Sequence, residues 1–431
     1  MISPPARCPC ATAMYSRLPP KMAGALHEIG TGRDVMGSLS FNPGGDVNGF
    51  LAARTGAACG RRRRLLYPYA VNDDRRDPSG LLLACLGDAA PVGAAQQLVE
   101  QVGVATAAHR LWAPVADSDL ILVNLESPLA RNSGTVGLFS RKTFTGLANN
   151  HIMDAGDHGL LETMDLLSAH GVPHAGAGRN LESARQPAVI EADGLRLGIL
   201  SAADPRFHAA GRTTAGVFPA QSELLRESIA ETTRRCDHVI VSLHVGIEFL
   251  PYPSPAQLCL ADTCLAAGAS LVLFHHAHCI AGHRQDARGV VLFGTGKYLF
   301  PYDFYVGHHG LTRWAIRRAR RAAAWQVRLA KARDVHVQRV IPLWIGANGF
   351  PEKPADSDAE WTLRWIRRLS RRSAAALPFW RTLALLNPVF AGLNARAYLE
   401  LARQAGFRKM LMMAFCGLRA QLGRHDGLAR P

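Results

Sequence analysis

The chain has 431 residues, of which 48% are hydrophobic and 19% charged, and its formal net charge is +15. This length allows two or three domains with a large core that needs no structural metal, and this composition excludes wholesale disorder. The positive charge taken alone would suggest binding to nucleic acid or to an anionic membrane.

The charge is unevenly distributed along the chain. Residues 1–80 carry 11 Lys and Arg against 6 Asp and Glu, residues 81–310 carry 15 against 21, and residues 311–431 carry 23 against 7. Fourteen of the 17 histidines lie in the acidic middle part. An acidic, histidine-rich centre is typical of a metal site rather than of a nucleic-acid surface, and no nucleic-acid partner is expected.

The cysteine and hydropathy patterns bear on the compartment. Nine cysteines cannot all pair within one chain, and their spacings contain no paired CxxC zinc pattern, so buried reduced thiols and a reducing compartment are favoured. No apolar run reaches the ~18–20 residues of a membrane span, and the N-terminus lacks the basic and apolar stretches of a signal peptide. The chain is therefore predicted to be cytoplasmic or peripheral to the membrane.

The predicted elements begin after a poorly patterned head. Residues 1–80 have scattered Gly and Pro and no sustained periodicity, so they are predicted to be disordered or loosely structured. Beyond them, strands are expected at 81–86, 120–124, 188–190, 195–200, 238–243, 270–274 and 289–293, and helices at 160–170 and 255–267. Strands that alternate with helices indicate an α/β fold.

The basic C-terminal part is predicted to be mostly helical. The expected elements are a basic helix at 311–333, a strand at 335–345 that Pro342 confines to a sheet edge, a Pro/Asp linker at 349–357, and helices at 358–373 and 380–422. Three domains follow from this organisation: the head at 1–80, a central domain at 81–350 and a basic helical tail at 351–431.

Tryptophans lie among the arginines of residues 311–431, namely Trp314, Trp325, Trp361, Trp365 and Trp380. Basic residues with interfacial tryptophans suit a helix that lies on an anionic membrane, so peripheral membrane contact through 311–431 is one interpretation. Docking of a partner protein and packing onto the core are the alternatives.

Five short polar clusters in the central domain end or follow apolar strand-like runs. They are Gly87-Asp88, Asn124-Leu125-Glu126, Asn149-Asn150-His151 with Asp154, Leu243-His244-Val245-Gly246 and His275-His276-Ala277-His278. Loops at the carboxyl ends of strands converge in α/β sheets, so these side chains are expected to meet. His276 and His278 would point to one side if the chain stays extended there. Carboxylates, carboxamides and imidazoles bind divalent metals, so the clusters predict a metal site.

In this order the clusters resemble the CapA family of bacterial capsule and poly-γ-glutamate synthesis proteins, which is related to the calcineurin-like metallophosphoesterases. The resemblance extends over about residues 81–300 and is most specific at Ala148–His151 with Asp154. Further matching residues are Asp119-Leu120, Ser127-Pro128, Gly156, Gly176-Ala177-Gly178 with Asn180 and Ala184, Val245–Phe249, Pro253, Gln257 and Ala267-Gly268-Ala269.

The resemblance implies a four-layer α/β/β/α metallophosphoesterase-like sandwich with a metal site at one sheet edge. The cofactors would be divalent ions (Mn, Fe or Zn), as many as two, which can clamp a phosphoryl group and activate water at neutral pH. The implied metal ligands are Asp88, Glu126, Asn150, His244, His276 and His278, with Glu126 bridging two ions. His151 would be the catalytic acid, and Asp154 either joins it in the site or caps the following helix. Candidate substrate-binding residues are Asn124, Asn149, Glu248 and Lys297.

Three features depart from the family pattern. Position 90 is Ala90, so the Asp-x-His pair of the wider phosphoesterase group is absent. Only 22 residues separate Glu126 from Asn149, which indicates that a helix and part of a strand are missing. Lys297 stands where the family usually has Asn.

Two functions from different classes are compatible with these residues. The first is a protein of capsule or poly-γ-glutamate synthesis that hydrolyses a phosphoester with metal ions and has the cell-envelope polymer or its synthase as partner. The second, favoured by the three departures, is a non-catalytic component that binds the polymer or the synthase and is attached to the membrane by its basic tail.

Overall fold

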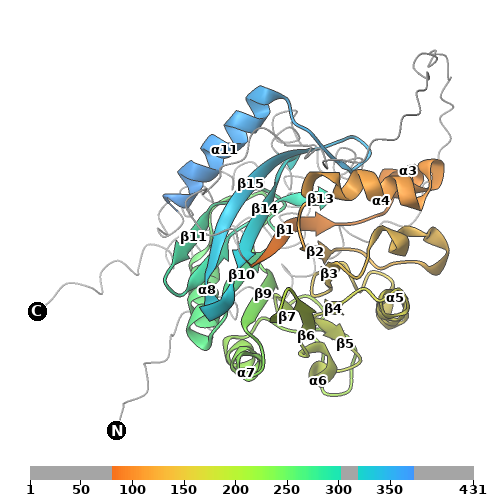
Figure 1. Cartoon of the computed structure of the whole chain (residues 1–431). Helices are drawn as coiled ribbons and strands as arrows, with labels where there is room; N and C mark the ends of the chain where they lie inside the picture. Colours follow the sequence, from red (N-terminus) through yellow and green to blue (C-terminus); the bar gives the residue numbers. More distant parts are fainter. Residues whose placement is uncertain (1–79, 302–318, 373–431) are drawn as a thin grey trace, which may run out of the picture. The chain divides into compact units, whose positions relative to one another are not determined.

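A computed structural model of the chain describes residues 80–301 and 319–372 (Figure 1). Two β-sheets pack face to face, and helices cover their outer faces. The predicted four-layer α/β/β/α architecture is therefore confirmed for the described residues.

The first sheet combines a parallel half and an antiparallel half. Its order is β16 (Pro351–Glu352), β15 (Val335–Ile345), β14 (Arg321–Leu329), β1 (Leu81–Ala89), β2 (Leu120–Leu125), β3 (Thr143–Gly146) and β4 (His174–Ala175), and β13 (Lys297–Leu299) pairs with the end of β1. Strands β1 to β4 and β13 run parallel, whereas β14 to β16 are antiparallel to their neighbours. The carboxyl ends of β1, β2 and β3 therefore lie at one edge.

The second sheet has a parallel centre with an antiparallel strand at each side. Its order is β11 (His283–Asp286), β12 (Gly289–Leu292), β10 (Leu271–Phe274), β9 (His238–His244), β7 (Leu195–Ala203) and β6 (Ala188–Ala192). A separate two-stranded sheet pairs β5 (Ala177–Gly178) with β8 (Gly216–Val217).

The main core lies between the two sheets. It includes Leu83 and Leu122 from the first sheet and Ile199 and Ile240 from the second, all fully buried. Strand β1 is buried along its whole length because the sheet is covered on both faces, which is why its sequence is almost continuously apolar.

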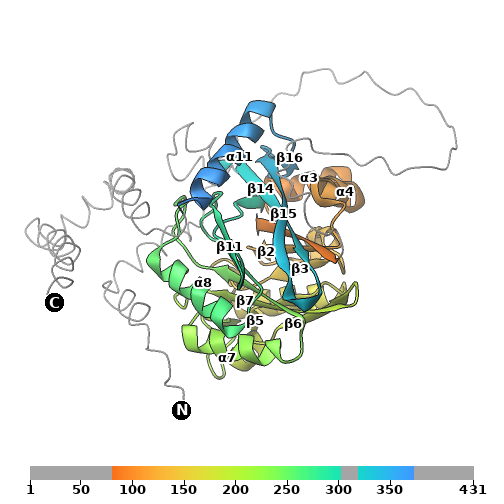
Figure 2. The same cartoon turned by 60° about the vertical axis from the view of Figure 1, so that its left-hand side comes forward.

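Helices form the two outer layers. A second core packs α7 (Ser222–Thr233) and α8 (Pro255–Ala267) against the outer face of the second sheet. Figures 1 and 2 show α3 (Ala94–Val102) and α4 (Val104–Trp112) on the opposite side of the molecule from α7 and α8. The remaining α-helices of the described residues are α5 (Gly156–Ala169), α6 (Leu181–Ala184) and α11 (Asp356–Ser370), and the short 3-10 helices there are η2 (Ala113–Val115), η3 (Arg131–Ser133), η4 (Thr135–Leu138) and η5 (Lys331–Arg333).

Local sequence signals set the ends of α8. Ser254 and Gln257 form a reciprocal capping box at its start, and Pro255 occupies the first turn, where its missing N–H leaves no hydrogen bond unmade. Gly268, with φ of 110°, ends the helix in the left-handed region that glycine adopts readily. The predicted helix at 255–267 is confirmed with the same bounds.

The predicted basic helix at 311–333 is wrong where the structure describes it. Residues 321–329 form β14, which pairs with both β1 and β15. Trp325 lies fully buried in the core between the sheets. The alanines and arginines of this segment favour a helix locally, but burial of the strand on both faces overrides that preference.

Two other predicted C-terminal elements are present in the structure. The strand at 335–345 is confirmed as β15, and β16 pairs with it only at Trp344 and Ile345, so Pro342 meets no partner strand on that side. The helix at 358–373 corresponds to α11. The head at 1–80, nearly all of which is undescribed, and the helix at 380–422 lie outside the described residues.

Helix α11 and the tryptophans near it pack onto the domain. Helix α11 contacts β15, β14 and β11 and buries Ile366. Trp361 stacks on Trp365 with ring centroids 5.4 Å apart, and the Arg321 guanidinium lies 4.0 Å from the Trp361 ring centroid. These side chains therefore contact one another and the core. Within residues 80–301 and 319–372, no helix combines the length and apolar character that crossing a membrane requires.

Five cysteines lie among the described residues. Cys85, Cys236, Cys264 and Cys279 are buried, and Cys259 is partly buried. Burial raises the pKa of Cys264 to about 12 and that of Cys85 further, so both stay protonated at neutral pH.

Candidate metal centre

The five polar clusters gather at one edge of the two sheets. Asp88 ends β1, Glu126 follows β2, Asn150 follows β3, and His244 ends β9 of the second sheet. The histidines at 275, 276 and 278 follow β10. The site is thus assembled from the carboxyl ends of parallel strands in both sheets.

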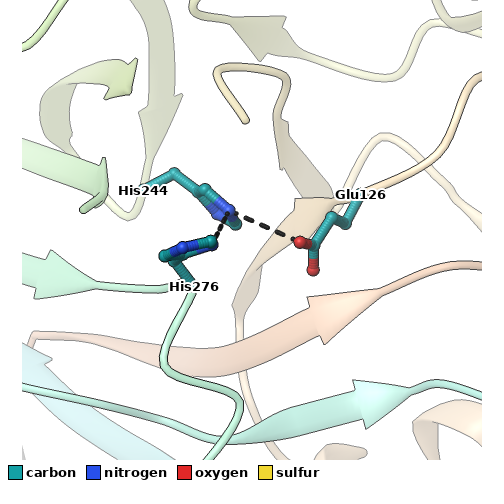
Figure 3. A group of neighbouring side chains, drawn as sticks. All are labelled: Glu126, His244 and His276. Carbon is teal, nitrogen blue, oxygen red and sulfur yellow. Dashed lines mark hydrogen bonds and ion pairs between the residues drawn. The ribbon is translucent and has the colours of Figure 1, made fainter. Parts of the chain in front are cut away.

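A first group of possible ligand atoms surrounds His244 (Figure 3). His244 Nε2 lies 2.7 Å from Asn150 Oδ1, 3.1 Å from His276 Nδ1 and 3.4 Å from Glu126 Oε1. Ligand atoms of Glu126, His244 and His276 all lie within 4.8 Å of one another. One carboxylate, two imidazoles and one amide oxygen thus converge.

A second group shares Glu126 and adds Asp88 and His278, whose ligand atoms also lie within 4.8 Å of one another. His278 Nδ1 lies 2.9 Å from Asp88 Oδ2, and Asn124 Nδ2 donates to Asp88 Oδ1 over 2.8 Å. Burial alone would raise the pKa of Asp88, but His275 and His278 hold it well below its ordinary value. Asp88 is therefore ionised and already hydrogen-bonded through both oxygens.

The surroundings of the Glu126 carboxylate indicate whether these residues fit a cation. Its side chain is 2% exposed, and neither carboxylate oxygen has a hydrogen-bond partner among the described residues. Burial, with the charges of Asp88 and Glu248, raises the pKa of Glu126 well above its ordinary value. His244 is no source of positive charge, because burial and the neighbouring His276 hold its pKa well below its ordinary value. A proton or a cation must balance the Glu126 charge, and the carboxylate, imidazole and amide donors around it suit Mn²⁺, Fe or Zn²⁺.

The histidine cluster after β10 reaches the site by a different backbone path from the expected one. The chain does not stay extended, because His276 and His278 have φ of 78° and 50°. Non-glycine residues adopt this left-handed region at a cost of about 1–3 kcal/mol and mostly at functional sites. The turn also brings the fully buried His275 into the centre, with Nδ1 3.4 Å from Asp88 Oδ1.

His151 and Asp154 form a pair at the open side of the site. His151 Nδ1 lies 2.9 Å from Asp154 Oδ2, and both side chains are partly exposed. Burial, the largest influence, lowers the pKa of His151, but the hydrogen bond and charge of Asp154 raise it above 6.5 overall. Asp154 does not cap α5, since Ala155 occupies the N-cap position. Of the two expected alternatives for Asp154, the structure shows the contact with His151.

Asn124 and Asn149 are buried beneath the ligand groups. Asn124 Nδ2 lies 3.1 Å from His244 Nδ1 in addition to its bond to Asp88. Asn149 Nδ2 donates to the Leu125 carbonyl over 2.7 Å, and Asn149 Oδ1 accepts from the Ile152 N–H over 2.8 Å. These contacts connect the loops after β2 and β3 and fix the orientation of the residues beside them.

Glu248 and Lys297 complete the charged residues of the site. Burial alone would raise the pKa of the partly buried Glu248, but His278, His276 and Lys297 lower it overall. Lys297 on β13 is fully buried, and burial lowers its pKa to about 8 although Glu248, Glu126 and Asp88 oppose this change. Ala90 packs with Phe300 and the partly buried Phe249 beside this lysine.

The short segment 127–148 does not displace the loop that follows it. The 3-10 helices η3 and η4 and the four-residue β3 occupy this segment. Asn150 nevertheless places its side-chain oxygen against His244.

Sequence reasoning missed residues after β7. The Phe207 ring centroid lies 5.1 Å from that of His276 and 6.1 Å from that of His244. Arg206 donates two hydrogen bonds to the buried Asp204, whose N–H bonds the His244 carbonyl. The signal was present, because Asp204 follows an apolar strand-like run in the same way as the five clusters do.

Comparison with known proteins places the chain in a family. The model of the bacterial capsule synthesis protein PGA_cap family matches residues 82–302, just over half of the chain. The chain belongs to this family. The match spans every proposed ligand, and the predicted resemblance to CapA proteins is confirmed.

This PGA_cap family member matches only part of the length of two curated relatives. It is 28% identical over 203 residues to the "PGA biosynthesis protein CapA" of Bacillus subtilis, covering 42% of this chain and 53% of the relative. It is 28% identical over 239 residues to a "probable polyglutamine synthesis accessory protein" of Mycobacterium tuberculosis, covering 52% of this chain and 61% of the relative. Among solved structures, 5'-nucleotidase from Candida albicans overlaps 69% of this chain and 60% of its own, with 10% identity and a TM-score of 0.37.

Proposed function

We propose that this protein acts in the synthesis of a capsule or poly-γ-glutamate polymer as a metal-dependent phosphoester hydrolase. The observation that carries the proposal is the buried carboxylate of Glu126, which has no hydrogen-bond donor in the described part of the chain and faces His244 and His276. Family membership and the names of the relatives support the part that concerns the polymer.

The proposed ligands are the six side chains of the two groups: Asp88, Glu126, Asn150, His244, His276 and His278. A divalent ion bound there would polarise a phosphoryl oxygen and lower the pKa of water. Asn124 and Asn149 are buried and bonded to protein atoms. We therefore propose that they orient His244 and the loop that carries Asn150, rather than contact the substrate.

His151 is the proposed proton donor. Its partner Asp154 stabilises the protonated imidazole and fixes which ring nitrogen faces the site. A protonated His151 at the open side can donate to the leaving oxygen of a phosphoester. Phe207, Glu248 and the Phe249 ring are partly exposed around the same opening and would contact the rest of the substrate.

The test is hydrolysis of p-nitrophenyl phosphate and bis(p-nitrophenyl) phosphate by protein loaded with Mn²⁺ or Zn²⁺. We expect turnover that EDTA abolishes and that His151→Ala lowers by about 10²–10⁴-fold without loss of bound metal. The matched control is His158→Ala, because His158 is an exposed histidine of α5 with no role in the site. Metal-loaded protein without turnover on either ester would refute the hydrolase.

A second function is favoured by one observation. Ala90 and the buried Lys297 lie beside the second ligand group. The wider phosphoesterase pattern has His at the position of Ala90, and the CapA family pattern has Asn at the position of Lys297. A site that binds metal and polymer without turnover would serve a non-catalytic component that holds the polymer or its synthase. Metal binding together with polymer binding, but no hydrolysis, would support this second function.

A further inference from the structure

Lys297 lies beside Asp88, a member of the second ligand group. In the parallel pairing of β13 with β1, Lys297 is the register partner of Asp88, so both side chains leave the same face of the sheet. Lys297 Nζ lies 4.3 Å from the Phe300 ring centroid and 5.8 Å from that of Phe249. The same two rings lie 5.2 Å and 6.5 Å from the His278 ring. Lys297 therefore stands beside Asp88 in the sheet and shares two aromatic neighbours with His278.

The first group has different neighbours. The Phe207 ring lies beside the rings of His244 and His276. Phe300 and Phe249, whose rings lie beside Lys297, also lie beside His278. The two groups thus share Glu126 but differ in that one of them already has a buried cation beside it.

Hydrogen bonding also separates the two groups. In the second group both oxygens of Asp88 are engaged, by Asn124 and by His278. The shared Glu126 has no donor among residues 80–301 and 319–372, whereas its neighbour His244 has Asn150 and His276 within hydrogen-bond distance of Nε2. Glu126 is therefore the ligand that still needs a positive charge, whereas Asp88 is already held by protein hydrogen bonds.

The balance of charge leads to the same result. Among the described residues, Lys297 interacts with the carboxylates of Asp88, Glu126 and Glu248. Three negative charges are neutralised by one divalent ion together with one ammonium group. A second divalent ion would leave an excess of two positive charges among these groups, and uncompensated buried charge costs several kcal/mol.

We propose that the Lys297 ammonium takes the place of a second metal ion, so that the centre binds one divalent ion, at Glu126, His244 and His276. This inference rests on the proposed metal centre and specifies how many ions it holds. The charge of Lys297 would fix the number of bound ions. An uncharged side chain at this position would leave space for a second cation and negative charge that the cation could balance.

The test counts Mn²⁺ ions bound per chain, by titration calorimetry and by elemental analysis after desalting, in wild type, Lys297→Asn and Lys297→Met. Electron paramagnetic resonance distinguishes an isolated Mn²⁺ from an exchange-coupled pair. The matched control is Lys142→Asn, since Lys142 is an exposed lysine away from the site. Circular dichroism establishes that each variant is folded, and Lys297→Met provides a second variant that removes the charge without adding an oxygen ligand.

We expect one ion with an uncoupled spectrum in wild type and in Lys142→Asn, and two ions with a coupled spectrum in the Lys297 variants. Two ions in wild type would overturn this inference while leaving the metal centre intact. One ion in both folded Lys297 variants would also overturn it. No bound ion in wild type would instead overturn the proposed metal centre itself.

Discussion

Replacing Glu126 with Gln should stabilise the metal-free protein, although most substitutions of buried residues destabilise. The Glu126 carboxylate is buried, has no donor among the described residues, and lies near the negative charges of Asp88 and Glu248. Glutamine keeps the shape of the side chain and removes the charge. A residue selected to bind a cation is thus expected to weaken the fold when the cation is absent.

The magnitude follows from the raised pKa of Glu126. The folded state holds its proton more tightly than the unfolded state, in which the carboxyl titrates at its ordinary value of 4.5. Stability therefore decreases as pH rises above 4.5, by up to about 1.4 kcal/mol per pH unit. At pH 7 the advantage of Glu126→Gln is at most about 3.5 kcal/mol, and it should vanish near pH 4.5.

The assay is urea denaturation in EDTA at pH 7 and pH 5, with Glu227→Gln as the matched control. Glu227 is an exposed residue of α7, so its substitution should change the unfolding free energy by less than about 0.5 kcal/mol. Saturating metal should reverse the order of stability, because wild type gains about 4.1 kcal/mol at a metal concentration of about 1,000 Kd and the variant gains less. If Glu126→Gln is less stable than wild type at pH 7 in EDTA, Glu126 has protein partners and the reasoning fails.

Three further predictions concern the core and the acid pair. Trp325→Ala should lower the unfolding free energy by about 3–5 kcal/mol, because Trp325 fills the space between the sheets. The control Trp361→Ala, at the surface of α11, should cost clearly less. Equal losses would contradict the placement of β14. His238 is buried with a lowered pKa, caused mainly by burial, so stability should fall by up to about 1.4 kcal/mol per unit as pH drops below 6.5, and this slope should weaken in His238→Gln. Asp154→Asn should lower the pKa of His151 measured by NMR in metal-free protein, and an unchanged value would show that the pair is not formed in solution.

The positions of most ligands could be predicted because their signal is local. Asp88, Glu126 and His244 each end or follow a buried apolar run, and the topology of parallel strands brings such positions to one edge. Asp204 follows β7 in the same way, and its N–H bonds the His244 carbonyl. The sheet order itself was not needed for this prediction.

The features that could not be predicted depend on contacts distant in sequence. Residues 321–329 carry alanines and arginines that favour a helix, and only pairing with β1 and β15 makes them a strand. The left-handed backbone at His276 and His278 could not be predicted, because neither position is a glycine. Lys297 faces the site because β13 pairs with the end of β1, a register that no local pattern in the sequence indicates.

The central claim is that a divalent ion binds where Glu126, His244 and His276 converge, and a crystal structure of Zn²⁺-loaded protein with anomalous scattering tests it most directly. The account predicts an anomalous peak about 2.0–2.3 Å from a Glu126 oxygen and from a ring nitrogen of each histidine. Crystals grown in saturating Zn²⁺ that show no peak there, with Glu126 bonded to a protein donor instead, would contradict it.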